Sequence, residues 1–534
     1  MTTALELLRQ GRRDDIWKKY CGFIDLSLEE FMEIQKHLLM EQIDLLSRRE
    51  LGRKLLGDKV PTNVQQFRAR VPLTTYADYA PYLMEKKEDI LPCKPRWWLR
   101  TSGRSGEYGG FKWVPYSPRM AKKLGETVLA LFILASCTRR GEFLFEEGDR
   151  MFYSMAPFAY MSGGVARAVQ EESPINFLPP LEEAEAMEYQ ERIQKGLKLA
   201  LREGVDHINA IAVVLARIGE QFTNGSGGLT LAPFLLHPRV LARLARVLIK
   251  ARMAGRKHLL PKDLWNAKGI ATGGTDTSIF RERIKKMWGQ EPIEAYGCTE
   301  AGVFSLQLWN CNGMTFLPDL DFLEFIPMHD YLKNKADPGY HPPTVLLDEV
   351  KAGEIYEVVV TNFSGGIITR YRVGDLVRIT SLDDEELRIH LPQMVYHSKS
   401  SDTIDLASFT RLTERTLWQA IEEAGIAYVD WTARKEHPDR KPVLCLYREP
   451  KAQVADAAGI KKQIHQNLKA LDSPYANLEQ MMGIDPLRVI LLPPGAFKRY
   501  YETKQREGAD SAHLKPAHMN ASDADLALLL DAHE

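Results

Sequence analysis

Three short segments of the chain combine residue types that can handle phosphate, metal and sugar groups. The first, 101–112, carries the aliphatic hydroxyls Thr101, Ser102 and Ser105, four glycines, and Lys112 at its end. Glycines let backbone N–H groups approach an anion, hydroxyls donate to phosphate oxygens, and the lysine adds a positive charge. Taken alone, such a segment is more often an ordinary flexible loop.

Two better-known loops are excluded for this segment. Phe111 stands directly before the lysine, where a Walker A loop needs glycine. Glu107 follows Gly106, where the nucleophile elbow of a hydrolase needs a further glycine. The absence of HExxH or clustered His/Asp ligands also argues against a metal hydrolase.

The second segment places a tyrosine, a hydroxyl and a carboxylate together at 295–300, as Tyr296, Gly297, Thr299 and Glu300. A Gly/Thr-rich run at 271–275 precedes it. On one tight turn these side chains can stack on a base, bind a phosphate and hold Mg²⁺, respectively. In isolation, a glutamate such as this one is more often a surface carboxylate.

The third segment is 369–377, with Gly374 and Asp375 at its centre. The glycine can open a turn, and the carboxylate can accept hydrogen bonds from two vicinal hydroxyls such as a ribose diol. An aspartate that only caps a strand turn would give the same pattern.

Alternating helices and strands must position these segments. A capping box at 27–30 and apolar residues at helical spacing predict a long amphipathic helix over 28–48. Apolar or β-branched runs are strand-like at 151–155, 208–215, 354–361 and 376–380. This alternation over about 400 residues favours an α/β fold, with sheets flanked by helices.

The pattern changes after about residue 400. A helix at 413–424, strands at 427–433 and 442–448, a helix at 460–471 and a strand at 487–492 are expected there. These elements predict a small α+β unit. With a boundary inside the polar run 397–408, we expect two domains, 1–400 and 401–534, as the length of 534 residues also suggests.

Composition restricts the class of protein. Hydrophobic residues make up 45% and charged residues 26% of the chain, with a net charge of −1. This balance does not indicate nucleic-acid binding. The basic helix expected at 239–255 could contact a membrane or polyanion, but a solvated face is the preferred interpretation.

The expected subcellular location follows from features that the sequence lacks. Six scattered cysteines without a CxxC pair suggest reduced thiols rather than a zinc site or disulfide framework. No signal peptide is recognised at the N-terminus, and the longest apolar stretch, near 127–136, is about half of the roughly 20 residues that a membrane span needs. A cytoplasmic protein without membrane contact is expected.

In this order, the three segments resemble the signature of the adenylate-forming superfamily, which includes acyl-CoA ligases, luciferases and adenylation domains. Further segments at 20–23, 71–79 and 494–497 resemble the auxin-responsive acyl-acid amido synthetase family, and a bacterial-type member is indicated. The stretch 507–516 is similar to the closing motif of that family. The resemblance runs over nearly the whole chain. It implies a large N-terminal domain that includes a small β-barrel, and a small mobile C-terminal domain.

The resemblance implies a role for each motif residue. The ATP phosphates would be held by Thr101, Ser102, Gly103, Ser105 and Lys112. Further ATP contacts would come from Gly274, Thr275, Tyr296, Gly297 and Thr299, with Tyr296 on the adenine and Thr299 at the α-phosphate. Glu300 would help to bind Mg²⁺, and Asp375 would accept hydrogen bonds from the ribose hydroxyls. Lys515 would neutralise charge at the α-phosphate, with Asp402 at the hinge.

Two features depart from the family pattern. Arg104 stands where a small hydroxyl residue is usual, and the stretch 107–111 is longer than usual before Lys112. The segment 156–165 resembles the acyl-binding segment of the family, with Phe158, Tyr160, Gly163 and Gly164 as candidate contacts, but a buried strand and turn would look the same.

The implied reaction has two steps. A carboxylate attacks the α-phosphorus of ATP and expels pyrophosphate, and an amine, by resemblance an amino acid, then attacks the acyl-AMP. Acyl-CoA ligation through the same first step is the alternative. Transfer to an alcohol or carrier thiol and a catalytically inactive binding protein are further alternatives. The acid and the amine are left open, and a monomer is preferred.

Overall fold

The structure is a computed structural model, and it divides into two compact units, Met1–Ser400 and Ser401–Glu534. It describes residues 2–105, 110–173, 175–187, 189–224, 245, 247–249, 251–253, 255–256, 259–273, 277–399, 403–407, 410–451, 456–483, 485–506 and 518–530. Each unit is described by itself.

In its described residues, the first unit is built on one mixed sheet of 11 strands, in the order β10-β11-β12-β13-β9-β8-β7-β6-β5-β3-β4. Neighbouring strands are parallel in the part β7-β6-β5-β3-β4. They are antiparallel in the part β10-β11-β12-β13-β9-β8-β7. The strands are β3 Arg150–Tyr153, β4 Asn176–Leu178, β5 His207–Ile211, β6 Gly269–Gly273, β7 Ile293–Cys298, β8 Gly302–Gln307, β9 Met314–Phe316, β10 Asp321–Pro327, β11 Ile355–Asn362, β12 Tyr371–Ser381 and β13 Gln393–Lys399.

The mixed α/β fold with flanking helices is confirmed. Hydrogen bonds join both halves of the sheet, so the β-barrel implied by the resemblance is not a separate sheet among the strands described here. Strand β7 lies where the parallel half meets the antiparallel half. The second motif therefore sits at the junction of the two halves.

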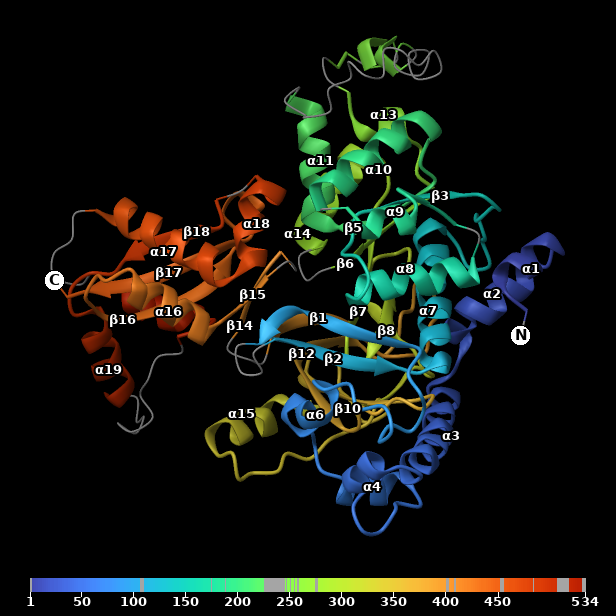
Figure 1. Cartoon of the computed structure of the whole chain (residues 1–534), viewed down its shortest axis with the longest axis horizontal. Helices are drawn as coiled ribbons and strands as arrows, with labels where there is room; N and C mark the ends of the chain where they lie inside the picture. Colours follow the sequence, from blue (N-terminus) through green and yellow to red (C-terminus); the bar gives the residue numbers. More distant parts are fainter. Residues whose placement is uncertain are drawn as a thin grey trace. The chain divides into compact units, whose positions relative to one another are not determined.

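Helices surround the parallel half, as Figure 1 shows. They are α7 Pro118–Ser136, α8 Met161–Glu172, α9 Leu181–Glu185, α10 Tyr189–Glu203, α11 Ala212–Asn224, α13 Pro261–Leu264 and α14 Thr277–Trp288. Helix α7 begins at the N-cap Ser117 and is buried along most of its length, which explains why its apolar run is so long. Close packing of α7 on α8 depends on Gly125, because a Cβ there would lie 2.5 Å from the carbonyl oxygen of Ala168.

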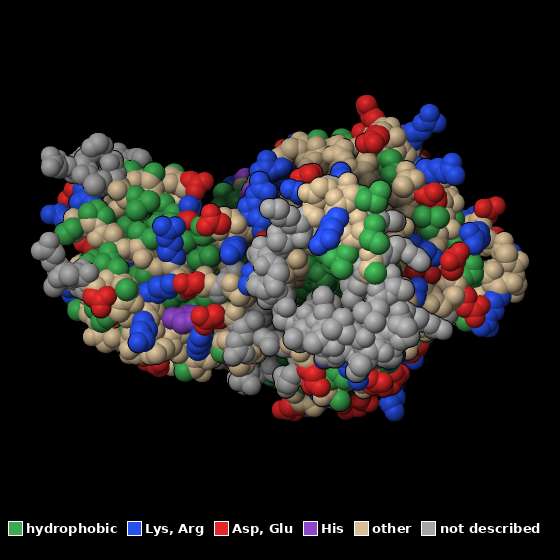
Figure 2. Space-filling model, turned by 90° about the horizontal axis from the view of Figure 1, so that it is seen from above, with side chains coloured by type: hydrophobic (Ala, Val, Ile, Leu, Met, Phe, Trp, Pro, Cys, Tyr) green, Lys and Arg blue, Asp and Glu red, His purple; other side chains and the backbone are tan. Residues whose placement is uncertain are grey.

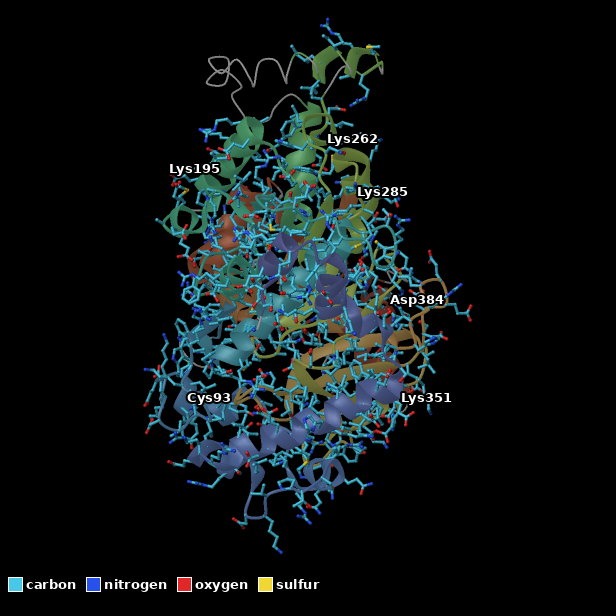
Figure 3. The ribbon with its side chains drawn as sticks, turned by 90° about the vertical axis from the view of Figure 1, so that its right-hand side faces the viewer. Cys93, Lys195, Lys262, Lys285, Lys351 and Asp384 are labelled. Carbon is cyan, nitrogen blue, oxygen red and sulfur yellow. The ribbon has the colours of Figure 1, made fainter. Side chains whose placement is uncertain are left out.

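The N-terminal segment is helical: α1 Ala4–Arg9, α2 Arg13–Cys21, α3 Leu28–Ser47, α4 Glu50–Leu56, α5 Val64–Arg70 and α6 Tyr76–Leu83. The long helix predicted at 28–48 is confirmed as α3, including the capping box between Ser27 and Glu30. Its buried Gln35 donates to the carbonyl of Asp321 and accepts from the N–H of Leu323, and so binds the edge strand β10. In Figure 3, α3 crosses the antiparallel part, where Lys351 and Asp384 are labelled.

A separate hairpin carries the first motif. Strand β1 (Trp97–Ser105) pairs antiparallel with β2 (Gly110–Tyr116), and the register shifts between Arg100 and Arg104. Tyr76, at the start of α6, donates its hydroxyl to the carbonyl of Trp113 and accepts from the N–H of the same residue. The hairpin is thus bound to the N-terminal helices.

The second unit is α+β, with β16 Tyr428–Glu436, β17 Val443–Pro450 and β18 Leu487–Leu491 in one sheet and β14 Thr403–Leu406 with β15 Thr410–Thr413 in another. Its helices are α16 Glu414–Glu423, α17 Ala457–Leu471, α18 Ser473–Met482, α19 Ala496–Arg506 and α20 Asp523–Leu530. The five elements expected between 413 and 492 are all present. Helix α18, from 473 to 482, was not predicted.

One histidine binds the end of this unit to its core. The ring of His518 lies between the carboxylates of Glu414 and Asp430, at 2.6 and 2.9 Å. It stacks on Trp431 with the ring centroids 4.5 Å apart. Burial lowers the pKa of His518, but the hydrogen bonds to the two carboxylates outweigh burial and raise that pKa above its ordinary value.

The structure divides one predicted strand, and one predicted helix falls mostly outside the described residues. The apolar run 208–215 is not one strand, because β5 ends at Ile211 and α11 begins at Ala212. Most of the basic helix expected at 239–255 lies outside the described residues.

Surface charge agrees with the near-neutral composition. Figure 2 shows acidic and basic side chains interspersed over the visible face. Among the residues described, no helix is long and apolar enough to cross a membrane. All six cysteines are unpaired.

Candidate functional site

The second motif forms a tight connection between β7 and β8 that requires glycine at both ends. A Cβ on Gly297 would lie 2.1 Å from the carbonyl oxygen of Gly302, and Gly302 itself has φ +81°. Other residues would clash or be strained in these places. The two glycines bring the strands close together and present Thr299 and Glu300 between them.

Tyr296 and Asp375 join the second and third motifs directly. The phenol of Tyr296 donates to Oδ2 of Asp375 over 2.8 Å, and both residues are buried. Burial and the neighbouring Asp375 carboxylate raise the pKa of Tyr296 well above its ordinary value, so the phenol stays protonated and acts as a donor. The ring packs edge-on against Phe304, with the centroids 5.0 Å apart, and lies beside Tyr396.

Glu300 is buried and held through both its backbone and its side chain. The hydroxyl of Tyr371 donates to Oε1 of Glu300 over 3.0 Å, and Nδ2 of Asn362 donates to its carbonyl over 2.9 Å. On the other side, the hydroxyl of Tyr116 donates to the carbonyl of Thr299 over 2.8 Å. Side chains from β2, β11 and β12 therefore fix the turn.

Within the described part of the chain, no lysine or arginine forms an ion pair with Glu300. A buried carboxylate without a basic partner suits a hard cation, and Mg²⁺ is commonly held by one or two carboxylates together with phosphate oxygens and water. No group of three metal-binding side chains is found among the residues described. The donor set thus fits a magnesium ion that arrives with phosphates.

Arg370, directly before β12, forms a buried ion pair that the sequence reasoning missed. Its guanidinium donates to both oxygens of Glu324, from Nε over 3.0 Å and from Nη2 over 2.8 Å. Its Nη1 donates to the carbonyls of Arg68 and Val71. The residue also has a positive φ of 45°. This pair secures the chain five residues before Asp375.

The start of β12 is secured a second time. Arg372 contacts the carboxylate of Glu357 on β11, with Nη2 2.6 Å from Oε2. Gly374 follows with φ +75°, next to a shift in the β11–β12 register. Asp375 is the cross-strand partner of Lys399 on β13. Asp375, the candidate for binding the ribose, is thus paired with β13, the strand that leads to the domain boundary. Asp402, the predicted hinge residue, lies outside the described residues.

The first motif is described in part. Thr101 is buried in β1, and Ser102, Gly103 and Ser105 continue this strand, although their side chains lie outside the description. Nζ of Lys112 lies 5.1 Å from the centroid of the Tyr76 ring. The predicted site residues Gly274, Thr275 and Lys515 are outside the described residues as well.

The predicted acyl-binding segment lies against β1. The guanidinium of Arg100 stacks over the ring of Tyr160 at 4.2 Å, and the N–H of Arg100 donates to the carbonyl of Ala159. Arg167 stacks over Phe158 at 3.9 Å. The segment is therefore a direct neighbour of the first motif.

The two glycines of this segment have a packing reason. A Cβ on Gly163 would lie 2.1 Å from the backbone nitrogen of Phe158, and one on Gly164 would lie 2.9 Å from Leu99. The space that they leave is filled by the protein's own atoms. These glycines let the start of α8 approach the preceding loop and β1.

Comparison with protein families gives the same assignment as the motifs. The GH3 family N-terminal domain matches residues 21–206, and the GH3 family central domain matches residues 314–392. The chain carries GH3 family domains and is homologous to GH3 acyl-acid amido synthetases. The central domain match includes Asp375, and the N-terminal one includes the first motif and the segment around Phe158.

Among the curated relatives of this chain is "Jasmonoyl--L-amino acid synthetase GH3.5" of Oryza sativa subsp. japonica, 27% identical over 50% of the chain and 48% of the relative. The match thus spans about half the length of that relative. "Indole-3-acetic acid-amido synthetase GH3.10" of Arabidopsis thaliana is 23% identical, over 93% of both proteins.

Solved structures agree in fold. The structure titled "AtGH3.15 acyl acid amido synthetase in complex with 2,4-DB" matches 93% of both chains with a TM-score of 0.51 and 18% identity. A 2-hydroxyisobutyryl-CoA ligase bound to 2-HIB-AMP and CoA matches 86% of this chain and 85% of the other, with a TM-score of 0.52 and 13% identity. At these identities the likeness concerns the fold alone.

Proposed function

We propose that the chain is an ATP-dependent acyl-acid amido synthetase. It would activate a carboxylic acid as its acyl-AMP with release of pyrophosphate, and then transfer the acyl group to an amine, in particular an amino acid. The observation that carries the proposal is the pair of hydrogen bonds Tyr296–Asp375 and Tyr371–Glu300, which join the second and third motifs. The names of the GH3 relatives support the same activity.

The described residues would act mainly by positioning and by charge. Asp375, fixed by Tyr296, would accept hydrogen bonds from the ribose hydroxyls, because Oδ1 and Oδ2 of a carboxylate offer several acceptor sites. The Tyr296 ring would lie against the base. Thr299 and the first motif would donate to phosphate oxygens. Such preorganised groups lower the barrier to charge development at the α-phosphorus.

Mg²⁺ would supply positive charge between the phosphates when it is bound. Glu300 would hold it, since its carboxylate is buried and fixed by Tyr371. The ATP would bring the remaining oxygen ligands, as is common for this ion.

The C-terminal unit, 401–534, would carry Lys515, which would neutralise charge during adenylation. Movement of this unit about the region of Asp402 would then withdraw the lysine and admit the amine. Phe158 and Tyr160 would contact the acid. The protein would work on small molecules in the cytoplasm, as a monomer.

The test is product analysis with the full-length protein. A panel of aryl, indolyl and fatty acids is screened for acid-dependent exchange of radiolabelled pyrophosphate into ATP. The best acid is then incubated with ATP, Mg²⁺ and either an amino-acid pool or CoA, and the products are weighed by mass spectrometry. We expect an amide. A CoA thioester would move the enzyme to the acyl-CoA ligases, and no exchange with any acid would contradict adenylation itself.

A further inference from the structure

Behind Glu300 lies a buried pair of polar side chains that the proposed reaction does not use. Asp321 on β10 and Asn362 on β11 are direct cross-strand partners, and neither is exposed to solvent. Nδ2 of Asn362 donates to Oδ1 of Asp321 over 2.8 Å. The same nitrogen donates to the carbonyl of Glu300. Asp321 therefore touches the residue that holds the Glu300 backbone.

Two oxygens of this pair have no donor in the described part of the protein. They are Oδ2 of Asp321 and Oδ1 of Asn362. A buried oxygen without a donor costs free energy, and these two oxygens belong to side chains that are already joined by one hydrogen bond. No basic residue among those described forms an ion pair with Asp321. Lys123, which contacts the same edge of the sheet, is paired with Asp319.

We propose that Asp321 is a neutral carboxylic acid in the folded protein, and that its Oδ2–H donates to Oδ1 of Asn362. One proton then satisfies both oxygens, because a carboxylic acid and a primary amide can form two parallel hydrogen bonds. Asn362 is held with its nitrogen toward Glu300. Asp321 is thus a positioning residue for the turn that carries Glu300, and this role rests on the proposed function of Glu300.

The surroundings favour the neutral acid. Complete burial raises the pKa of Asp321 well above its ordinary value, and the hydrogen bond from Asn362 opposes this only in part. The titratable groups around it are Tyr116 on β2, Cys298 on β7 and Glu300 on the turn. Burial also raises the pKa of Tyr116 and of Cys298, so both stay neutral. None of the three offers a positive charge to a buried carboxylate.

The proposal is tested spectroscopically with the full-length chain and the variant Asp321→Asn. The infrared difference spectrum between the two at neutral pH should show the carbonyl stretch of a protonated carboxylic acid in the wild type, absent from the variant. The asparagine keeps both hydrogen bonds, since its Nδ2 can donate to Asn362. A difference spectrum with carboxylate bands instead would overturn the proposal.

Stability provides a second measurement with a definite sign. The folded protein retains the proton of Asp321, whereas the unfolded chain releases it above about pH 3.9. The contribution of Asp321 to stability therefore decreases as the pH rises. The folded-to-unfolded ratio falls by up to about tenfold per pH unit. The melting temperature of Asp321→Asn relative to wild type should rise from pH 5 to pH 8. An unchanged difference would show that Asp321 is ionised at both pH values.

The positioning role is tested separately by pyrophosphate exchange. We expect Asp321→Asn to keep the wild-type exchange rate within about twofold, while Asp321→Leu and Asn362→Leu lower it by about tenfold or more, as loss of a hydrogen bond in a buried network does. Equal rates in all three variants would refute the positioning role. If the wild type showed no exchange with any acid, the proposed function would be refuted instead. The infrared result on Asp321 would still stand.

Discussion

The buried ion pair Arg370–Glu324 allows the sharpest prediction about stability. Substitution Arg370→Met keeps an apolar side chain of similar length but removes the direct partner of the buried Glu324, which retains only Arg68, with its Nε 4.0 Å from Oε1. Breaking such a pair costs about 3–5 kcal/mol. An entropy of unfolding of about 2.1 cal/mol/K per residue gives roughly 0.8 kcal/mol/K for the 400 residues of the first unit. The melting temperature of this unit should therefore fall by about 4–6 °C.

The assay is differential scanning calorimetry of the full-length chain, with an exposed pair as the matched control. Arg48→Met removes an ion pair with Asp44 on the solvent side of α3 and should cost less than about 1 kcal/mol, a shift near 1 °C. The double variant Arg370→Met, Glu324→Leu should recover most of the loss, since both charges are gone. A shift for Arg370→Met no larger than that for Arg48→Met would refute the assigned role of the pair.

Two further predictions concern the site and the C-terminal unit. Tyr296→Phe keeps the buried ring but removes its hydrogen bond to Asp375, so we expect the KM for ATP to rise by about tenfold or more, in line with about 1.5–3 kcal/mol for a bond to a charged group; an unchanged KM would contradict a role of this bond in nucleotide binding. His518→Gln should destabilise the chain more at pH 6 than at pH 9, because the pKa of His518 is raised by Asp430 and Glu414 and the stability that its charge provides is lost as the pH rises through that pKa. Thermal unfolding at the two pH values measures this, and an equal loss at both would contradict it.

Local signals were sufficient for several elements of the fold. The capping box at Ser27 and the helical spacing after it predicted α3, and β-branched runs predicted β11 and β12. Each of these signals depends on residues that are close together in the sequence. The run 208–215 was misjudged because a fully buried strand and the start of a buried helix are both continuously apolar, so periodicity cannot separate β5 from α11.

The types and order of the site residues were predicted from the sequence. The hydrogen bonds and ion pairs that hold these residues in place were not. Tyr296 and Asp375 were named from their motifs, while the hydrogen bond between them was not. Arg370 stood in a quoted motif without a role, because its partner Glu324 is 46 residues away. Asn362 had no local signal at all. Contacts of this kind depend on strand order and register, which one sequence does not encode in any short pattern.

The central claim is adenylation at the site of Tyr296, Glu300 and Asp375. Its most direct test is acid-dependent ATP–pyrophosphate exchange by the wild-type chain beside Asp375→Ala and Lys515→Ala, with the fold of each variant checked by circular dichroism. We expect exchange in the wild type, and a loss on the order of 100-fold or more in both variants, as for removal of a preorganised charge-stabilising group. Full exchange in both folded variants would contradict the site assignment.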